Sequence, residues 1–332
     1  MTFPIPPERV TVAIEGWNAS DLDSMALFER SMGTLAKQTY PINACEILIL
    51  VDESVGTHGP EGYRSYFPEA RIVTVPSSTY FKTKNAAIDQ ATRDVLVFAD
   101  SDVAYQADWL EQMLSALAAY DGVIAGNTQF DQGFLSRSLS ITEWAATRLD
   151  SGPTDWFYGN NLAARRVLLQ KYGFREDLGQ SGGGSVDIVR DRMLADGVSI
   201  WFNADARGWH HVAPFWSKYL RLGAYQIHTR RMAPGMRWSW LARVPVLAPY
   251  LVIGGGLLKA WRRAWRLRST LPLHGWSLPA YLVSITFVKS VEWVGAVWYA
   301  YFPGWVRSRH DWFDVPVSPP LGISNSASSA RS

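Results

Sequence analysis

Four short and largely apolar runs, separated by helix-like stretches, constrain the fold of this chain more than any other feature. They are Val10–Ile14, Cys45–Val51, Arg71–Val75 and Val95–Ala99. The second and fourth are apolar almost throughout, which is typical of strands that helices cover on both faces. Helical stretches are expected near 22–35, 83–91 and 106–119, and Val123–Ala125 has the composition of a fifth strand. This order predicts an α/β fold with a doubly wound, mostly parallel sheet.

Carboxylates stand at the ends of these runs, where ligands of a doubly wound sheet bind. Glu15 follows the first run, Asp52 the second and Asp100 the fourth. Asp100 and Asp102 flank one serine, so on an extended loop both can face a single Mg²⁺ or Mn²⁺ that keeps positions open for phosphate oxygens. Such a cation helps a diphosphate to leave by neutralising its charge. Two solvated turn aspartates are the alternative, and the position after a buried strand, level with Asp52, favours the metal site.

The charges of the chain are divided unevenly along its length. Residues 1–205 carry 16 basic and 27 acidic side chains, a net of −11, whereas residues 206–275 carry ten Arg and two Lys without Asp or Glu, a net of +12. Eleven of the 16 Trp also lie beyond residue 205. Basic residues interleaved with Trp and Leu are typical of proteins on an anionic membrane surface. Nucleic acid is the alternative partner, but no motif for reading it accompanies the charge, so we expect no nucleic-acid binding.

Two apolar stretches in the C-terminal third predict helices that associate with a membrane. Leu241–Leu258 contains prolines and a glycine triplet and has basic residues on both flanks, which favours an interfacial or re-entrant hairpin over one crossing. In Leu278–Trp305, Lys289 and Glu292 stand at i, i+3 and can pair, but they make a lipid-exposed span costly. We therefore expect a docked helix, with a span as the alternative.

These features divide the chain into three predicted parts. We expect an α/β domain at 1–235, basic and Trp-rich membrane-associated helices at 236–310, and a disordered tail at 311–332. Met1–Glu8 holds three prolines and no apolar run, so we expect no signal peptide. The predicted location is the cytoplasmic face of a membrane, to which the protein is bound as a peripheral or monotopic protein.

Six ordered segments resemble those of glycosyltransferase family 2 enzymes. They are Val10–Asn18 with Gln38–Pro41, Glu46–Ser54, Thr83–Ala87 with Ala91, Asp100–Asp102, Gly159–Arg165 and Tyr172–Glu176. The resemblance extends over roughly residues 8–230. It implies the GT-A fold, a nucleoside diphosphate sugar as donor, and one displacement that inverts the anomeric carbon with the help of a carboxylate base and a divalent metal.

The resemblance also implies roles for single residues on the donor side. Asp52 is expected to hydrogen-bond the base or ribose, Asp100 to contact the sugar or ribose, and Asp102 to coordinate the metal together with Asp100. The other expected donor-side residues are Ile14, Glu15, Trp17, Lys84, Asn85 and Ser101. Capping of the next turn is the alternative role for Asp52, and an exposed helix position is the alternative for Lys84.

The family's base normally follows a Glu in a Glu-Asp pair at a helix start after a glycine-rich loop. Here the loop Gly179–Ser185 leads to Asp187 without that Glu, so Asp187 is the expected base, with helix capping as its alternative role. His211, in the pair His210-His211, is the expected third metal ligand. Asn160 and Asn161 are expected at the acceptor side, or as turn-forming residues.

The sequence thus predicts an inverting, metal-dependent glycosyltransferase that acts on a membrane-borne acceptor, either lipid-linked or glycan. A catalytically weak scaffold that binds sugar nucleotides at the membrane is the alternative. A nucleotidyltransferase is less favoured, because Glu15-Gly-Trp-Asn18 is not the glycine-rich loop that such an enzyme needs after its first strand.

Overall fold

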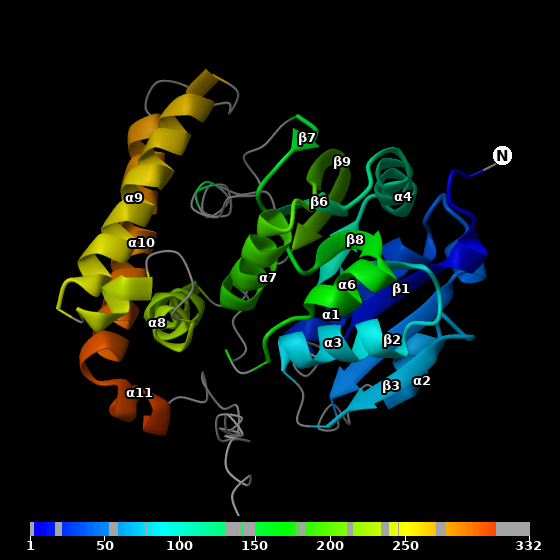
Figure 1. Cartoon of the computed structure of the whole chain (residues 1–332), viewed down its shortest axis with the longest axis horizontal. Coiled ribbons are helices and arrows are strands. Elements are labelled where there is room, and N and C mark those ends of the chain that lie inside the picture. The colour runs from blue at the N-terminus through cyan, green and yellow to red at the C-terminus, as the bar shows by residue number, and fades with distance from the viewer. Residues whose placement is uncertain are drawn as a thin grey trace, which may run out of the picture.

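The computed structural model describes residues 3–16, 22–52, 59–76, 79–130, 138, 141, 150–176, 178, 183–210, 215–233, 239–244, 246–269 and 277–309. Its strands are β1 (Val10–Glu15), β2 (Glu46–Asp52), β3 (Arg71–Val75), β4 (Val95–Asp100), β5 (Val103–Tyr105), β6 (Val123–Phe130), β7 (Gly152–Pro153), β8 (Asn161–Arg165) and β9 (Ile200–His210). Its helices are α1 (Leu22–Ala36), α2 (Gly59–Arg64), α3 (Tyr80–Gln90), α4 (Trp109–Ala119), α6 (Arg166–Tyr172), α7 (Gly183–Ala195), α8 (Phe215–Met232), α9 (Ala248–Arg266), α10 (Ser277–Tyr301) and α11 (Pro303–Arg309). Figure 1 shows the sheet with its helices on one side of the molecule and α8 to α11 on the other.

All the strands of the described residues lie in one sheet. Its order is β3-β2-β1-β4-β8-β6-β9-β5, and β7 pairs with β9. The first four strands are mutually parallel, as the alternation of apolar runs and helices predicts. Beyond β4, β8 is antiparallel to both β4 and β6, while β9 is parallel to β6 and antiparallel to β5. The predicted α/β class is confirmed, and the antiparallel insertion is an addition to it.

Two apolar layers enclose the parallel strands, because alternate side chains of each strand point to opposite faces. On one face, Val12 and Ile14 of β1 pack with α1, α2 and α4. On the other face, Ala13 of β1 and Phe98 of β4 pack with α3, α6 and α7. The sheet is therefore buried on both sides, and its strand ends are left for polar residues.

Helices α8, α9 and α10 form a separate layer with its own apolar core. Gly223 of α8 and Gly295 of α10 let these two helices touch at the backbone: an added Cβ would overlap the carbonyl oxygen of Glu292 at the first position and that of Leu220 at the second. The close crossing holds α10 along α8. The predicted boundary at residue 235 falls after α8, although α8 packs mainly with this layer.

Many large apolar side chains of this layer face outward. On α9 these include Tyr250, Leu251, Leu258, Trp261 and Trp265, which are 39–57% exposed. Among the described residues, α10 is the helix with the length and apolar composition needed to cross a membrane, and 39% of its most apolar window is buried inside the protein. The predicted ion pair within α10 is confirmed, since Lys289 Nζ lies 2.7 Å from Glu292 Oε1.

Candidate active site

The end of β4 and the end of β1 meet side by side and position the predicted Asp100-Ser101-Asp102 loop. Glu15 and Asp100 are neighbours in the parallel register. The Ser101 amide donates to the Glu15 carbonyl over 2.9 Å, and the Asp100 amide donates to the Tyr105 hydroxyl over 2.9 Å. These main-chain contacts fix the loop, and they leave the carboxylates of Asp100 and Asp102 to other partners.

Helix α3 presents Tyr80 and Lys84 to the Asp100 carboxylate. The two residues are four apart and so lie on one face of the helix, whose first turn is capped by Thr79. Lys84 Nζ is 2.5 Å from Asp100 Oδ1, and the Tyr80 hydroxyl donates to Asp100 Oδ2 over 3.1 Å. Burial raises the pKa of Asp100, and the Lys84 charge opposes that shift. Burial and the Asp100 charge also raise the pKa of Tyr80, so its phenol stays protonated and able to donate.

Asp102 meets a histidine of β9. Val103 pairs with His210 across β5 and β9, and this register brings His210 Nε2 within 3.2 Å of Asp102 Oδ2. Both side chains remain about one-fifth exposed, so a ligand can reach them. The other half of the histidine pair, His211, lies outside the described residues, and its predicted ligand role stays a prediction.

The residues predicted to line the donor pocket divide into several groups. Ile14 is fully buried within the apolar core under α1, α2 and α4, because its place in β1 points it away from the Lys84 side of the sheet. Its predicted role in the base pocket stays a prediction. Glu15 and Ser101 are buried beside Asp100. For Asp52 only the backbone, at the end of β2, is described, and Trp17 lies outside the described residues.

Asn85 is next to Lys84 in the chain but takes a different part. Its amide nitrogen donates to the Phe174 carbonyl over 2.8 Å and to Glu176 Oε1 over 2.7 Å. Its oxygen accepts from the Phe174 amide. These bonds join α3 to Phe174 and Glu176 in the segment after α6. The Asn85 side chain therefore holds α3 in place and does not make the predicted contact with the donor.

The two predicted acceptor-side asparagines also differ. Asn161 is fully buried, where its oxygen accepts from Trp109 Nε1 over 2.8 Å and its nitrogen donates to the Ala206 carbonyl over 3.2 Å. Both polar atoms of its side chain are thus hydrogen-bonded inside the protein, so Asn161 does not contact the acceptor with its side chain as predicted. Asn160 is half-buried, with its oxygen accepting from the Thr128 hydroxyl and its carbonyl accepting from Tyr105, so it lies beside the Asp100 loop.

Asp187, the predicted base, lies in the first half of α7 and is held by an arginine. Arg190 donates to Asp187 Oδ1 over 2.7 Å and also pairs with Asp191, while its guanidinium lies 5.1 Å from the centre of the Trp156 ring. Burial raises the pKa of Asp187 to about 6, and the charges of Arg190 and Arg230 work against that rise. A carboxylate with such a pKa accepts a proton near neutral pH more readily than an exposed aspartate.

The donor atoms present suit a divalent cation that is bound together with a diphosphate. Among the described residues there is no group of three or more His, Cys, Asp or Glu side chains that could hold a metal ion alone. Asp102 and His210 supply one carboxylate and one imidazole at mutual contact, and Mg²⁺ and Mn²⁺ commonly complete their shells with water and substrate phosphates. Asp100, in contrast, is occupied by Lys84 and Tyr80, so it positions the loop more than it offers a ligand.

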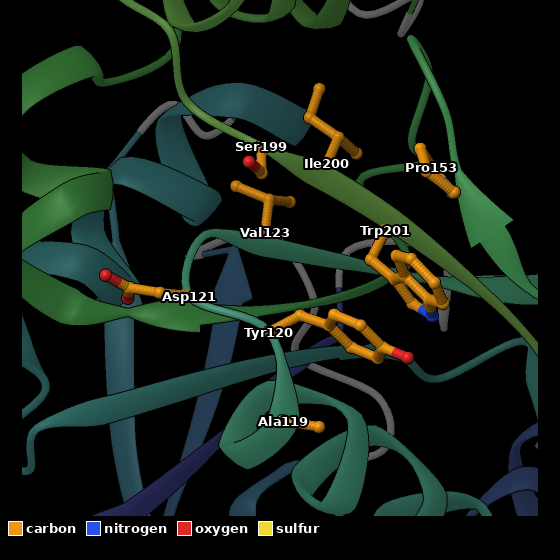
Figure 2. A pocket seen from close by; sticks show the side chains of 8 residues that line it. All are labelled: Ala119, Tyr120, Asp121, Val123, Pro153, Ser199, Ile200 and Trp201. Carbon is orange, nitrogen blue, oxygen red and sulfur yellow. The ribbon is translucent and has the colours of Figure 1, made fainter.

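A hollow at the amino-terminal ends of two inner strands, β6 and β9, has no such group of carboxylate, lysine and histidine side chains among its described lining residues. Figure 2 shows it between the starts of β6 and β9, where Tyr120 stacks on Trp201 with 3.6 Å between ring centres. Because parallel strands place their ligands at the carboxyl ends, this hollow is separate from the Asp100 loop.

Sequence reasoning missed Tyr80 and Tyr105 as parts of this site, and in the histidine pair it preferred His211 to His210. Tyr80 could have been found, since it stands four residues before Lys84 at the start of a helix. Tyr105, and the choice of His210 within the pair, could not have been found, because their contacts depend on the pairing of β5 with β9.

A carboxylate loop at the strand ends of a mostly parallel sheet, with a lysine and a histidine against it, suits an enzyme that binds a nucleoside diphosphate together with a cation. Comparison with known proteins is more specific. The family model described as Glycosyl transferase family 2 matches residues 26–176. Glycosyltransferase AglE of Haloferax volcanii is 25% identical over 245 residues, which cover 68% of this chain and 76% of that protein.

Among solved structures, the mannosyltransferase PcManGT from Pyrobaculum calidifontis, in complex with GDP-Man and Mn²⁺, has a similar fold. Its TM-score is 0.58 at 18% identity, over 90% of this chain and 89% of that chain. Residues 26–176 of the chain therefore match a glycosyltransferase family 2 domain, the fold is that of GT-A enzymes, and the protein is a glycosyltransferase.

Proposed function

We propose that this protein transfers a sugar from a nucleoside diphosphate sugar to a membrane-borne acceptor, with inversion at the anomeric carbon. The observation that carries the proposal is the pairing of Asp102 with His210 beside the buried Lys84–Asp100 pair. These groups lie at the carboxyl ends of β1 and β4, where a GT-A sheet binds its donor. The PcManGT complex supports GDP-mannose as the first donor to test and Mn²⁺ as the first metal.

Each residue of the site has a part in the proposed reaction. Asp102 and His210 would hold a divalent cation, which would supply Lewis-acid stabilisation of the departing diphosphate when bound. Lys84 and Tyr80 keep the Asp100 carboxylate in place, so the loop does not reorganise when the donor enters. Asp187 takes the proton of the acceptor hydroxyl, and Arg190 holds its carboxylate in one orientation.

The outward-facing side chains of α9 support a membrane as the place of action. Trp261 and Trp265 are 39% and 57% exposed, one turn apart on a helix that also carries exposed Arg262 and Arg266. Aromatic rings at headgroup depth and arginines against lipid phosphates give such a helix affinity for an anionic surface. We place the protein on the cytoplasmic face, bound as a peripheral or monotopic protein.

Release of GDP from GDP-mannose in the presence of vesicles and Mn²⁺ tests the proposal. Wild-type protein and Arg262→Ala should release GDP, while Asp187→Asn should lose the acceptor-dependent part of the release. Chelation of the metal should stop the reaction in every variant. If Mn²⁺-dependent GDP binding persists but no tested nucleotide sugar is turned over, the protein is a sugar-nucleotide-binding scaffold and the transferase proposal fails.

A further inference from the structure

A cavity of about 610 Å³ lies among α8, α9 and α10 and is closed on one side by the short helix Ser239–Arg243. Its walls are mainly apolar. Leu241 and Ile253 are buried in the wall, while Trp240 and Leu251 are about half exposed. The cavity therefore joins the apolar core of the helical layer to the surface on which the exposed aromatic side chains of α9 lie.

Cations outnumber carboxylates among the described lining residues. Arg230, Lys259 and Lys289 line the cavity together with Glu292. Glu292 is neutralised by Lys289, whose Nζ contacts both of its oxygens at 2.7 and 2.8 Å. Three cations and one carboxylate leave two positive charges, those of Arg230 and Lys259. An anion that entered the cavity would meet both.

Arg230 is partly satisfied and partly available. One of its terminal nitrogens donates to the main-chain and side-chain oxygens of Gln226, each at 2.7 Å. Its buried Nε finds no hydrogen-bond partner among the described residues. A partly buried guanidinium with a buried, unused donor is costly unless a ligand accepts from it. Helix α8, which carries Arg230, packs against α7, and the Arg230 charge lowers the pKa of Asp187 on α7.

We propose that this cavity binds the phosphate of a membrane lipid, with Arg230 and Lys259 contacting the phosphate and the lipid chain leaving past Trp240 and Leu251. The inference rests on the proposed function and names its acceptor class: a lipid-linked acceptor, anchored by its phosphate in the cavity, with its glycan reaching Asp187. Guanidinium and ammonium donors bind phosphate oxygens strongly. Free phosphate has the same head chemistry, but the apolar walls give it nothing further to bind.

Calorimetric titration of the full chain with dodecyl phosphate, dodecanol and inorganic phosphate separates these sources. The lipid proposal expects dodecyl phosphate to bind at least about tenfold more tightly than either fragment, since head and chain each contribute. Equal binding of inorganic phosphate would overturn the lipid part of the proposal. Equal binding of dodecanol would overturn the part played by Arg230 and Lys259.

The glycines of α9 provide a matched pair of variants for the cavity itself. A Cβ at Gly255 or at Gly254 meets nothing within 4 Å, and leucine favours the helix over glycine at either position. Gly255 lines the cavity, whereas Gly254 lines a neighbouring hollow of about 190 Å³. Gly255→Leu should weaken dodecyl phosphate binding about tenfold or more by filling the site, and Gly254→Leu should not.

A second matched pair tests the charge. Lys259 and Arg262 are both exposed and three residues apart on α9, but only Lys259 is among the described lining residues of the cavity. Lys259→Gln should weaken dodecyl phosphate binding about tenfold. Arg262→Gln should leave it unchanged, because Arg262 does not line the cavity and a single dodecyl phosphate molecule offers no membrane surface for the outer face of α9 to bind. Equal losses in both variants would mean that a diffuse basic surface, and no built site, attracts the lipid.

An error in the lipid-phosphate cavity and an error in the proposed transferase function give different experimental results. GDP binding with Mn²⁺ is measured on the same variants. If Gly255→Leu and Lys259→Gln bind dodecyl phosphate like the wild type while Mn²⁺-dependent GDP release continues, the cavity assignment is overturned and the transferase stands. If GDP does not bind at all, the donor site itself is wrong.

Discussion

Two buried lysine–carboxylate pairs lie in the two halves of the molecule, and they are built differently. Lys84 and Asp100 come from α3 and β4, so their 2.5 Å contact joins two elements at a strand end. Lys289 and Glu292 are neighbours within α10 and pair at i, i+3. The first pair fixes the shape of a ligand site. The second neutralises charge inside a helical layer whose outer surface carries both large apolar and basic side chains.

A lysine–carboxylate pair therefore serves ligand binding in the sheet and helix packing in the helical layer. In the sheet, Asp100 is also held by Tyr80, and its loop continues to Asp102, so a disturbance there reaches the donor. In the helical layer, Glu292 stands where α8 and α10 cross at Gly223, so a disturbance there reaches the packing of helices.

Removal of either lysine should have the largest effect on stability. Lys84→Met and Lys289→Met each remove the lysine charge that faces a buried carboxylate, which costs about 3–5 kcal/mol of unfolding free energy. The loss should shrink as pH falls, because a buried carboxylate that has lost its lysine has a raised pKa and its protonation removes the buried charge. Urea unfolding at several pH values measures both effects.

The exposed pair Lys171–Asp196 is the control for this test, and Lys171→Met should leave urea unfolding unchanged because solvent screens the pair. GDP binding should separate the two buried pairs, since Lys84→Met weakens it and Lys289→Met does not. Unchanged stability in both lysine variants would show that these carboxylates are not charged in the folded protein.

Asp102→Asn should have the next largest effect, and it should act on donor binding and sugar transfer rather than on stability. We expect sugar transfer to fall by about 10²–10³-fold, which is typical of losing one group that stabilises a leaving group. The melting point should hold, because Asp102 is on the loop after β4 and is partly exposed. Asp205→Asn, an exposed carboxylate elsewhere on β9, should transfer sugar at the wild-type rate. Equal rates for both variants would remove Asp102 from the site.

The helical layer is tested by the double variant Trp261→Ser with Trp265→Ser. Loss of two exposed rings should weaken binding to anionic vesicles about tenfold, because each ring contributes buried apolar area at the interface. GDP binding should not change, since both rings are in the other half of the molecule. Tyr120→Ser, in the hollow at the amino-terminal ends of β6 and β9 (Figure 2), is the control, and it should bind vesicles as the wild type does. A comparable loss in that control would show that the surface of α9 has no special affinity for lipid.

The smallest expected effect is a shift of the pH profile. Asp187 must be deprotonated to accept a proton, and burial raises its pKa to about 6, so kcat should rise as pH increases through about 6. Arg190→Gln removes a charge that lowers this pKa, and the rising limb should therefore move to higher pH. A limb that stays in place in this variant would argue that another group is the base.

The parallel half of the sheet and the Asp100 loop could be predicted from the sequence because both depend on local patterns. Apolar runs indicate buried strands, and the end of each run locates the end of its strand. The partners of Asp102 could not be predicted in this way, since His210 reaches it only through the pairing of β5 with β9. Strand alternation decides which face a residue serves, which is why Ile14 lies in the core and Glu15 is buried beside Asp100.

Asn161 teaches the same lesson at the acceptor side. Adjacent asparagines look equivalent in the sequence. In the structure the Asn161 side chain hydrogen-bonds Trp109 and the Ala206 carbonyl, whereas Asn160 lies beside the Asp100 loop. The cavity in the helical layer was beyond sequence reasoning altogether, because it depends on how α8, α9 and α10 pack together.

The proposed donor site requires Asp102 and His210 to hold a divalent cation together with a nucleoside diphosphate. The direct test is the melting temperature of the wild type and of Asp102→Asn with GDP, with Mn²⁺, and with both together. A ligand that binds the folded state raises the melting temperature, so the wild type should respond to GDP and Mn²⁺ together far more than to either alone, and Asp102→Asn should lose that joint response. A joint response of the same size in both proteins would contradict the account.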